Sequence, residues 1–142
     1  GLVIGELSWK LKLLEKEYTT SIDLKSKGVV SAIYRFNGLY ESFGEINNKK
    51  LSPNKYSQKW VTKKKERDVK IFFNNFRVSK MKLSPEEKEF ARINYIGLVG
   101  YCDPLTSFLK TYSFVCFKCR FPWHTPNPVT IFRLTLNYCL HQ

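Results

Sequence analysis

The sequence contains few of the patterns that mark enzymes and membrane-spanning proteins. No run of about 18 or more apolar residues occurs, which excludes a transmembrane helix from this sequence. A Gly-rich phosphate loop, a G-x-S-x-G elbow and an H-E-x-x-H motif are all absent. Only two histidines occur, His124 and His141, and both lie near the C-terminal end. We therefore expect a protein that is not an enzyme and that uses no cofactor.

Carboxylates are also scarce. The chain has 12 Asp and Glu residues against 24 Lys and Arg residues, so its formal net charge is +12. Candidate acid–base residues such as Glu41, Glu45 and Asp103 form no defensible catalytic set. The cationic excess favours anionic partners and does not choose among lipid, lipopolysaccharide and nucleic acid. Most of it lies in residues 49–82, which include the run TKKKER.

Cysteines are too few and too close to the C-terminus to staple the main body of the chain. Cys116, Cys119, His124 and Cys139 form a weak candidate set of zinc ligands. The pairing of Cys139 with His141 at one intervening residue is poor geometry for a second pair of ligands. Unpaired thiols or an adventitious disulfide explain the cluster better, so we predict no metal site.

Alternating apolar and polar residues dominate the rest of the sequence. In the segment 6–14, Leu7, Trp9, Leu11 and Leu13 alternate with polar side chains, which is typical of a strand with one buried face. Similar patterns predict strands in 18–26, 56–62, 67–73 and 77–83, and a strongly curved pair of strands in 29–46. The segment 86–95 fits a helix or a strand. With 43% apolar and 15% aromatic residues, the chain can form a core.

One short helix is predicted near residues 103–112. Asp103 is a favoured N-cap residue type, and Pro104 suits the first helical position. After it the composition changes, because residues 113–142 hold three of the six prolines and no acidic residue. The sequence therefore predicts a single mainly β domain over residues 1–112. Residues 113–142 form an atypical tail with the character of a frameshifted or poorly packed end.

A series of short motifs occurs in a characteristic order: GELSWKLKL, SKG, FNGLYESFGEI, LSPNKYSQKW, KKKERDVKIFF and DPLTSFL. In this order they resemble the bacterial family known as domain of unknown function 3108, whose members are exported envelope proteins. The resemblance covers about residues 3–112 and leaves the tail unmatched. It rests on Gly5, Ser26, Gly28, Gly38, Gly44, Pro53, Tyr56, the basic residues around Arg67, and Asp103, Pro104 and Leu105.

The resemblance implies a curved antiparallel sheet, half-barrel or lipocalin-like, in the periplasm or at the outer membrane. It implies no catalytic residues. The family usually has an aromatic-rich strand ahead of the position of Gly5, so the first strand is clipped here. Because the chain begins with Gly1, we expect a fragment whose signal peptide is missing.

Two sets of binding residues follow from these predictions. The first set would hold an apolar ligand or partner segment on the sheet: Trp9, Tyr34, Phe36 and Trp60. The second would contact anionic lipid, lipopolysaccharide or another anionic envelope component: Lys63, Lys64, Lys65 and Arg67. TKKKER is itself interpreted first as a solvated connection between two strands. The alternative function is a cytoplasmic module that binds nucleic acid or another polyanion, although no nucleic-acid recognition motif occurs.

Overall fold

A computed structural model describes residues 2–48, 50–86, 94–95, 98–117 and 129–138 of the chain. The strands are β1 (Leu2–Leu13), β2 (Glu17–Ser26), β3 (Phe36–Asn47), β4 (Lys50–Thr62), β5 (Glu66–Asn74), β6 (Arg77–Ser84) and β7 (Val129–Tyr138). The helices are α1 (Gly28–Ile33) and α2 (Pro104–Phe117). No helix of the described part is long and apolar enough to cross a membrane.

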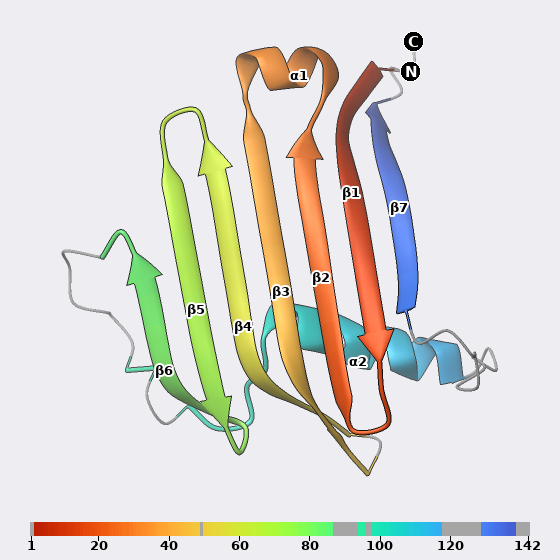
Figure 1. The fold of residues 1–142 in the computed structure, drawn as a ribbon, viewed down its shortest axis with the longest axis vertical. Helices are drawn as coiled ribbons and strands as arrows, with labels where there is room; N and C mark the ends of the chain where they lie inside the picture. Colours follow the sequence, from red (N-terminus) through yellow and green to blue (C-terminus); the bar gives the residue numbers. More distant parts are fainter. Residues whose placement is uncertain (1, 49, 87–93, 96–97, 118–128, 139–142) are drawn as a thin grey trace.

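The strands form one antiparallel sheet in the order β6-β5-β4-β3-β2-β1-β7 (Figure 1). Each of the first six strands pairs with its neighbour in sequence, as short connections between antiparallel strands allow. The sheet is open and ends at β6 and β7. The prediction of a mainly β fold, with an antiparallel sheet and a short helix near residues 103–112, is confirmed.

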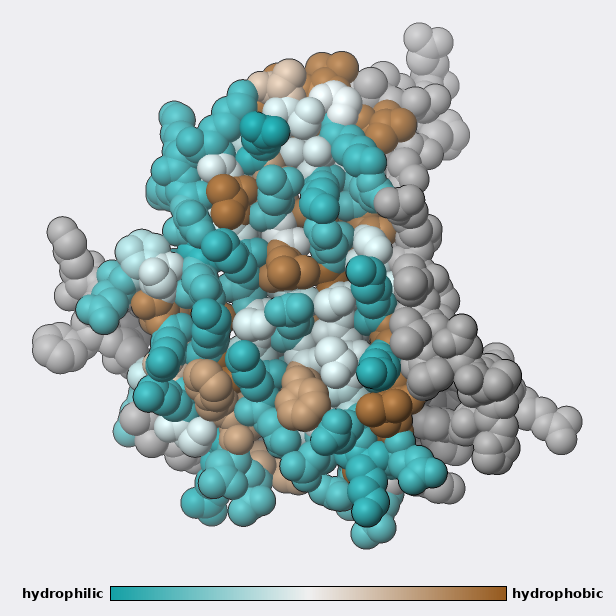
Figure 2. Space-filling model, in the orientation of Figure 1, coloured by the Kyte–Doolittle hydropathy of each residue, from teal (hydrophilic) through white to brown (hydrophobic). Residues whose placement is uncertain are grey.

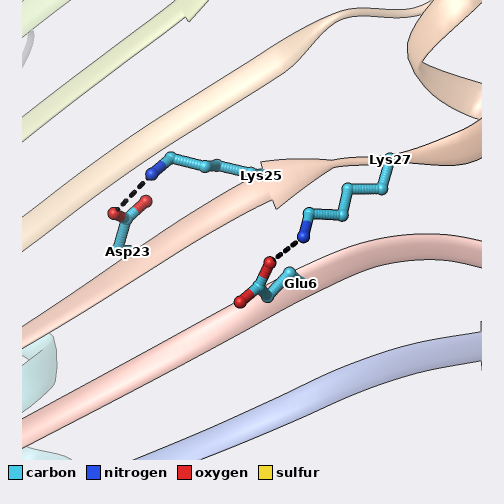
Figure 3. Close-up of polar contacts among 4 residues, drawn as sticks. All are labelled: Glu6, Asp23, Lys25 and Lys27. Atoms are coloured by element: carbon cyan, nitrogen blue, oxygen red, sulfur yellow. Dashed lines mark hydrogen bonds and ion pairs between the residues drawn. The ribbon is translucent and has the colours of Figure 1, made fainter.

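The two faces of the sheet differ in chemistry because side chains alternate along each strand. Trp9, Ile22 and Tyr40 lie in one row of the register and share the face that packs against α2. The opposite face is largely hydrophilic (Figure 2). It carries exposed ion pairs, including Lys25 with Asp23 at 2.9 Å (Figure 3). The period-2 pattern of the sequence thus produces two different faces. We call the face that packs against α2 the dry face and the hydrophilic one the wet face.

Helix α2 covers part of the dry face and forms the core with it. It crosses the sheet behind the end at which β1 turns into β2 (Figure 1). Leu105 and Leu109 of α2 are buried, and Leu109 belongs to the same cluster as Trp9, Leu11 and Tyr18. A fully buried leucine contributes about 1.5–3 kcal/mol through the hydrophobic effect. Burial of these leucines therefore stabilises the contact between α2 and this part of the dry face.

The prediction of a curved strand pair over 29–46 is wrong in its first part, because Gly28–Ile33 forms α1. Gly28 has φ +61°, a left-handed conformation that glycine adopts without strain. A Cβ atom there would overlap the carbonyl oxygen of Val3. This tertiary contact with β1 turns the chain out of β2, and the β-branched residues that follow form a helical turn despite their strand propensity.

The boundary predicted at residue 112 falls inside α2, and the sheet continues beyond it. Strand β7 pairs with β1 from Leu2 opposite Tyr138 to Lys12 opposite Val129. The segment separated as an atypical tail therefore supplies one strand of the sheet. The segment 86–95, for which the sequence leaves helix and strand open, lies mostly outside the described residues.

Candidate functional site

The structure separates the four predicted ligand residues. Trp9 is buried beneath α2, its ring meets Phe108 edge-to-face with centroids 5.2 Å apart, and its Nε1 donates to Thr20 Oγ1 at 2.8 Å. It belongs to the core rather than to an accessible surface. Tyr34 is exposed at the C-cap of α1 and lies outside the strands of the sheet. Only Phe36 and Trp60 remain as candidates on the sheet.

Phe36 and Trp60 lie on the half of the dry face that extends toward α1. Gly38 is the centre of this region, because a Cβ atom there would lie 2.9 Å from both Phe36 Cε1 and Tyr40 Cε2. Trp60 of β4 pairs with Gly38. The missing side chain leaves room for the rings of Phe36 and Tyr40, and Trp60 lies opposite on the neighbouring strand. We call this surface the aromatic half-face: Leu24, Phe36, Tyr40, Trp60 and Arg67.

The side chains of the aromatic half-face are all half-buried. The sequence analysis missed Tyr40, although its signal was present: Phe36 and Tyr40 stand two residues on either side of Gly38. Neither position reveals by itself that β4 brings Trp60 beside them. That juxtaposition depends on the register between β3 and β4.

The four residues predicted to contact anions also divide into two groups. Lys63, Lys64 and Lys65 are exposed in the turn between β4 and β5, which confirms that this run connects two strands. Arg67 is half-buried in β5 and pairs with Trp60, so it belongs to the aromatic half-face. A guanidinium at the border of an aromatic surface can bind an anionic group.

A second set of functional groups lies beneath the start of α2. This buried hydroxyl cluster consists of Tyr18, Ser42, Asp103 and Thr106. Asp103 Oδ1 accepts from the Thr106 backbone N–H at 2.9 Å, which confirms Asp103 as the helix N-cap. Asp103 Oδ2 accepts from Thr106 Oγ1 at 2.5 Å and from Ser42 Oγ at 3.1 Å. Since the Thr106 hydroxyl donates to Asp103, the Tyr18 hydroxyl donates to Thr106 Oγ1, at 2.6 Å.

This geometry suits a structural role better than a catalytic one. Each member of the cluster is at most 2% exposed, so a substrate has no access to the hydroxyls. Burial raises the pKa of Tyr18 to about 12, which makes its hydroxyl harder to ionise than that of a free tyrosine. Every buried side-chain polar atom of the described residues has a hydrogen-bond partner. The cluster thus fastens α2 to β2 and β3.

The raised tyrosine pKa values predict a loss of stability in alkali. Burial raises the pKa of Tyr56 to about 12 as well, with a further contribution from the charge of Asp103. A folded pKa above the unfolded value of about 10 means that stability is complete below pH 10 and falls between pH 10 and 12. At pH 11 we expect a loss of about 1.4 kcal/mol per tyrosine. Urea unfolding from pH 9 to 11 measures it.

The matched variant for this test is Tyr18→Phe, which removes one of the two titrating groups. Its unfolding free energy should decline about half as steeply between pH 9 and 11 as that of the parent. A parent whose stability is constant over this range would contradict the buried, protonated state of both tyrosines.

The four candidate zinc ligands of the sequence have no described side chains. Cys116 lies in α2 without a described side chain, and Cys119, His124 and Cys139 lie outside the described residues. Within the described residues, no group of three or more His, Cys, Asp or Glu could hold a metal ion. Cys102 is a free thiol whose Sγ lies 3.0 Å from Ser107 Oγ.

Comparison of the chain with protein-family models, curated proteins and solved structures finds no match. The resemblance to domain of unknown function 3108 stays a prediction from the ordered motifs. The aromatic half-face is the surface on which a functional proposal can be built, because its side chains remain partly accessible.

Proposed function

We propose that the protein is a non-enzymatic cell-envelope protein, periplasmic or outer-membrane-associated, that binds an apolar ligand or partner segment on the aromatic half-face. One observation carries the proposal. Phe36, Tyr40 and Trp60 gather around Gly38 on the part of the dry face next to the part that α2 occupies. Partly accessible aromatic rings offer a large apolar contact area at low conformational cost.

Arg67 narrows the class of ligand. It lies opposite Trp60 in the β4–β5 register, at the border of the aromatic half-face. An amphiphile with an apolar chain and one anionic group would match both elements, the rings through its chain and the guanidinium through its charge. The envelope location rests on the family resemblance alone. The proposal of a non-enzymatic protein is supported by the burial of the hydroxyl cluster, because a substrate has no access to these polar groups.

Dodecanoate is a suitable probe, because it combines an apolar chain with a carboxylate. We expect saturable binding, which calorimetric titration measures. Tyr40→Ala should weaken it about ten-fold, since removal of one aromatic contact costs on the order of 1–2 kcal/mol. Arg67→Gln should weaken binding of dodecanoate and leave that of uncharged dodecan-1-ol unchanged.

The matched control is Phe43→Ala. Phe43 lies on the same strand as Tyr40, is exposed, and belongs to the opposite face of the sheet. This variant should bind dodecanoate as the parent does. Absence of saturable binding by the parent, or an equal loss in Tyr40→Ala and Phe43→Ala, would refute the aromatic half-face as a ligand site.

A further inference from the structure

The end of the sheet that carries α1 also carries the turn between β4 and β5. We call this turn, residues 63–65, the lysine turn. The connection from β2 to β3 and that from β4 to β5 both lie at this end (Figure 1). Lys63 Nζ donates to the carbonyl oxygen of Ala32, which ties the turn directly to α1. The turn is closed by Thr62, whose N–H donates to Lys65 O at 2.8 Å and whose Oγ1 accepts from Lys65 N at 3.0 Å. The lysines therefore stand on a hydrogen-bonded turn beside the helix.

Helix α1 presents apolar side chains to solvent. Ile33 is 79% exposed, and Val29 and Tyr34 are each 57% exposed. No residue of α1 is buried, so the helix does not contribute a side chain to the core. Figure 2 shows hydrophobic residues at this end of a largely hydrophilic face, which also carries single hydrophobic residues elsewhere. Exposed apolar groups gathered in one place indicate an interaction surface.

The charges around α1 are not balanced. Carboxylates near this end already have partners: Glu6 pairs with Lys27 and Asp23 with Lys25 (Figure 3). Glu66, next to the turn, pairs with Lys59 at 2.8 Å. Within the described part of the chain, Lys64 and Lys65 have no ion-pair partner. The lysine turn thus adds positive charge that its surroundings leave uncompensated.

We propose that this end of the sheet docks on an anionic lipid bilayer, with α1 entering the interfacial region and the lysine turn contacting the head groups. The docking surface consists of Val29, Ile33, Tyr34, Lys63, Lys64 and Lys65. Aliphatic and tyrosine side chains partition into the membrane interface, and lysines near an anionic surface are attracted to it. The inference extends the anionic contact predicted for the lysines and does not depend on the aromatic half-face.

A bilayer fits this surface better than a nucleic acid does. A nucleic acid would be bound through its phosphates, which contact the lysines. The exposed apolar residues Val29 and Ile33 would then have no role. Stacking of bases requires aromatic platforms, and the apolar part of this surface is mostly aliphatic. A bilayer uses both components, because the acyl region accepts the aliphatic groups and the head groups accept the charges.

Cosedimentation with vesicles of phosphatidylglycerol and phosphatidylcholine tests the proposal. At low salt the parent should bind these vesicles and should not bind vesicles of phosphatidylcholine alone. Replacement of Lys63, Lys64 and Lys65 by Gln should weaken binding about 100-fold, from the usual contribution of a lysine at an anionic surface. The double variant Val29→Ser, Ile33→Ser should weaken it at least ten-fold at unchanged charge.

Two control variants carry the same chemical changes on the hydrophilic face. Lys55, Lys80 and Lys82 are exposed there, and their replacement by Gln removes three charges far from α1. Leu39 and Phe43 are exposed apolar residues of that face, and their replacement by Ser removes two apolar groups. Both controls should bind vesicles nearly as the parent does. Equal losses in controls and test variants would overturn the proposal.

Two further outcomes also count against it. If the Val29→Ser, Ile33→Ser variant binds like the parent while the lysine variant does not, the surface recognises a polyanion; binding of single-stranded DNA would then identify a nucleic-acid interface.

The second measurement uses Ile33→Trp, in which lipids with brominated acyl chains should quench the new fluorescence. Absence of additional quenching relative to the parent would show that α1 does not enter the bilayer.

Discussion

Replacing Gly44 by alanine is expected to destabilise the protein by about 3 kcal/mol, the upper part of the usual range for overpacking a core. Gly44 lies in β3 between Tyr18 and Pro53, beside a register shift. A Cβ atom there would overlap the backbone carbonyl oxygen of Ser52 and lie 2.6 Å from Tyr18 Cε1. Neither neighbour can move freely, because one is backbone and the other is held in the buried hydroxyl cluster.

The clash outweighs the intrinsic preference of strands for alanine over glycine, which is about 0.5–1 kcal/mol. A loss of about 3 kcal/mol lowers the thermal midpoint by roughly 10 °C in a chain of this size. Calorimetry or thermal denaturation followed by circular dichroism measures the shift.

Gly38→Ala is the matched control on the same strand. Its new Cβ atom would meet only the edges of two half-buried rings, Phe36 and Tyr40, at 2.9 Å. Such side chains can rotate away, so we expect a loss of about 1 kcal/mol. A Gly44→Ala variant at least as stable as Gly38→Ala would show that the backbone near Ser52 yields more readily than this geometry implies.

The strands were predictable because their signal is local. Alternation along β1 and β2 assigns each side chain to a face without knowledge of the partner strand. The same alternation could not place Trp9 beneath α2, because it shows which face is dry and not which part of that face α2 covers. Phe108 of α2 reaches Trp9 across 99 positions of the chain, and no local pattern encodes that contact.

The candidate sites were predictable to different degrees. Phe36 and Trp60 are strand aromatics whose type and period already indicated an apolar surface. The β3–β4 register is what places Tyr40 near Trp60. Arg67 lies on the sheet rather than in the lysine turn because β5 begins at Glu66. Helix α1 was missed for a tertiary reason, the close approach of Gly28 to Val3. Its exposed apolar residues were therefore not recognised as a surface.

The buried hydroxyl cluster shows the same limit. Asp103 was predicted as a helix cap from two adjacent residues, and the capping bond to Thr106 confirms it. Its second bond reaches Ser42, 61 positions earlier in the chain. Local preference therefore explains how α2 begins, whereas the choice of its position on the sheet depends on hydrogen bonds between distant segments.

That difference leads to the second large effect. Asp103→Ala should destabilise the protein by about 3 kcal/mol, because two losses combine. Removal of an N-cap costs about 0.5–2 kcal/mol. The hydroxyls of Ser42 and Thr106 also lose their carboxylate acceptor in a buried site, and each unsatisfied buried polar group costs about 1–3 kcal/mol. Urea denaturation followed by circular dichroism measures the total.

Two variants separate the components of this loss. Asp103→Asn keeps a good capping oxygen for the Thr106 N–H but replaces the second acceptor oxygen by an amide, so it should lose less than Asp103→Ala. Asp23→Ala removes a carboxylate whose ion pair with Lys25 is exposed, and should change stability by no more than about 0.5 kcal/mol. If Asp103→Ala matched Asp23→Ala, the cluster could not be what holds α2 on the sheet, and burial of Leu105 and Leu109 would have to suffice.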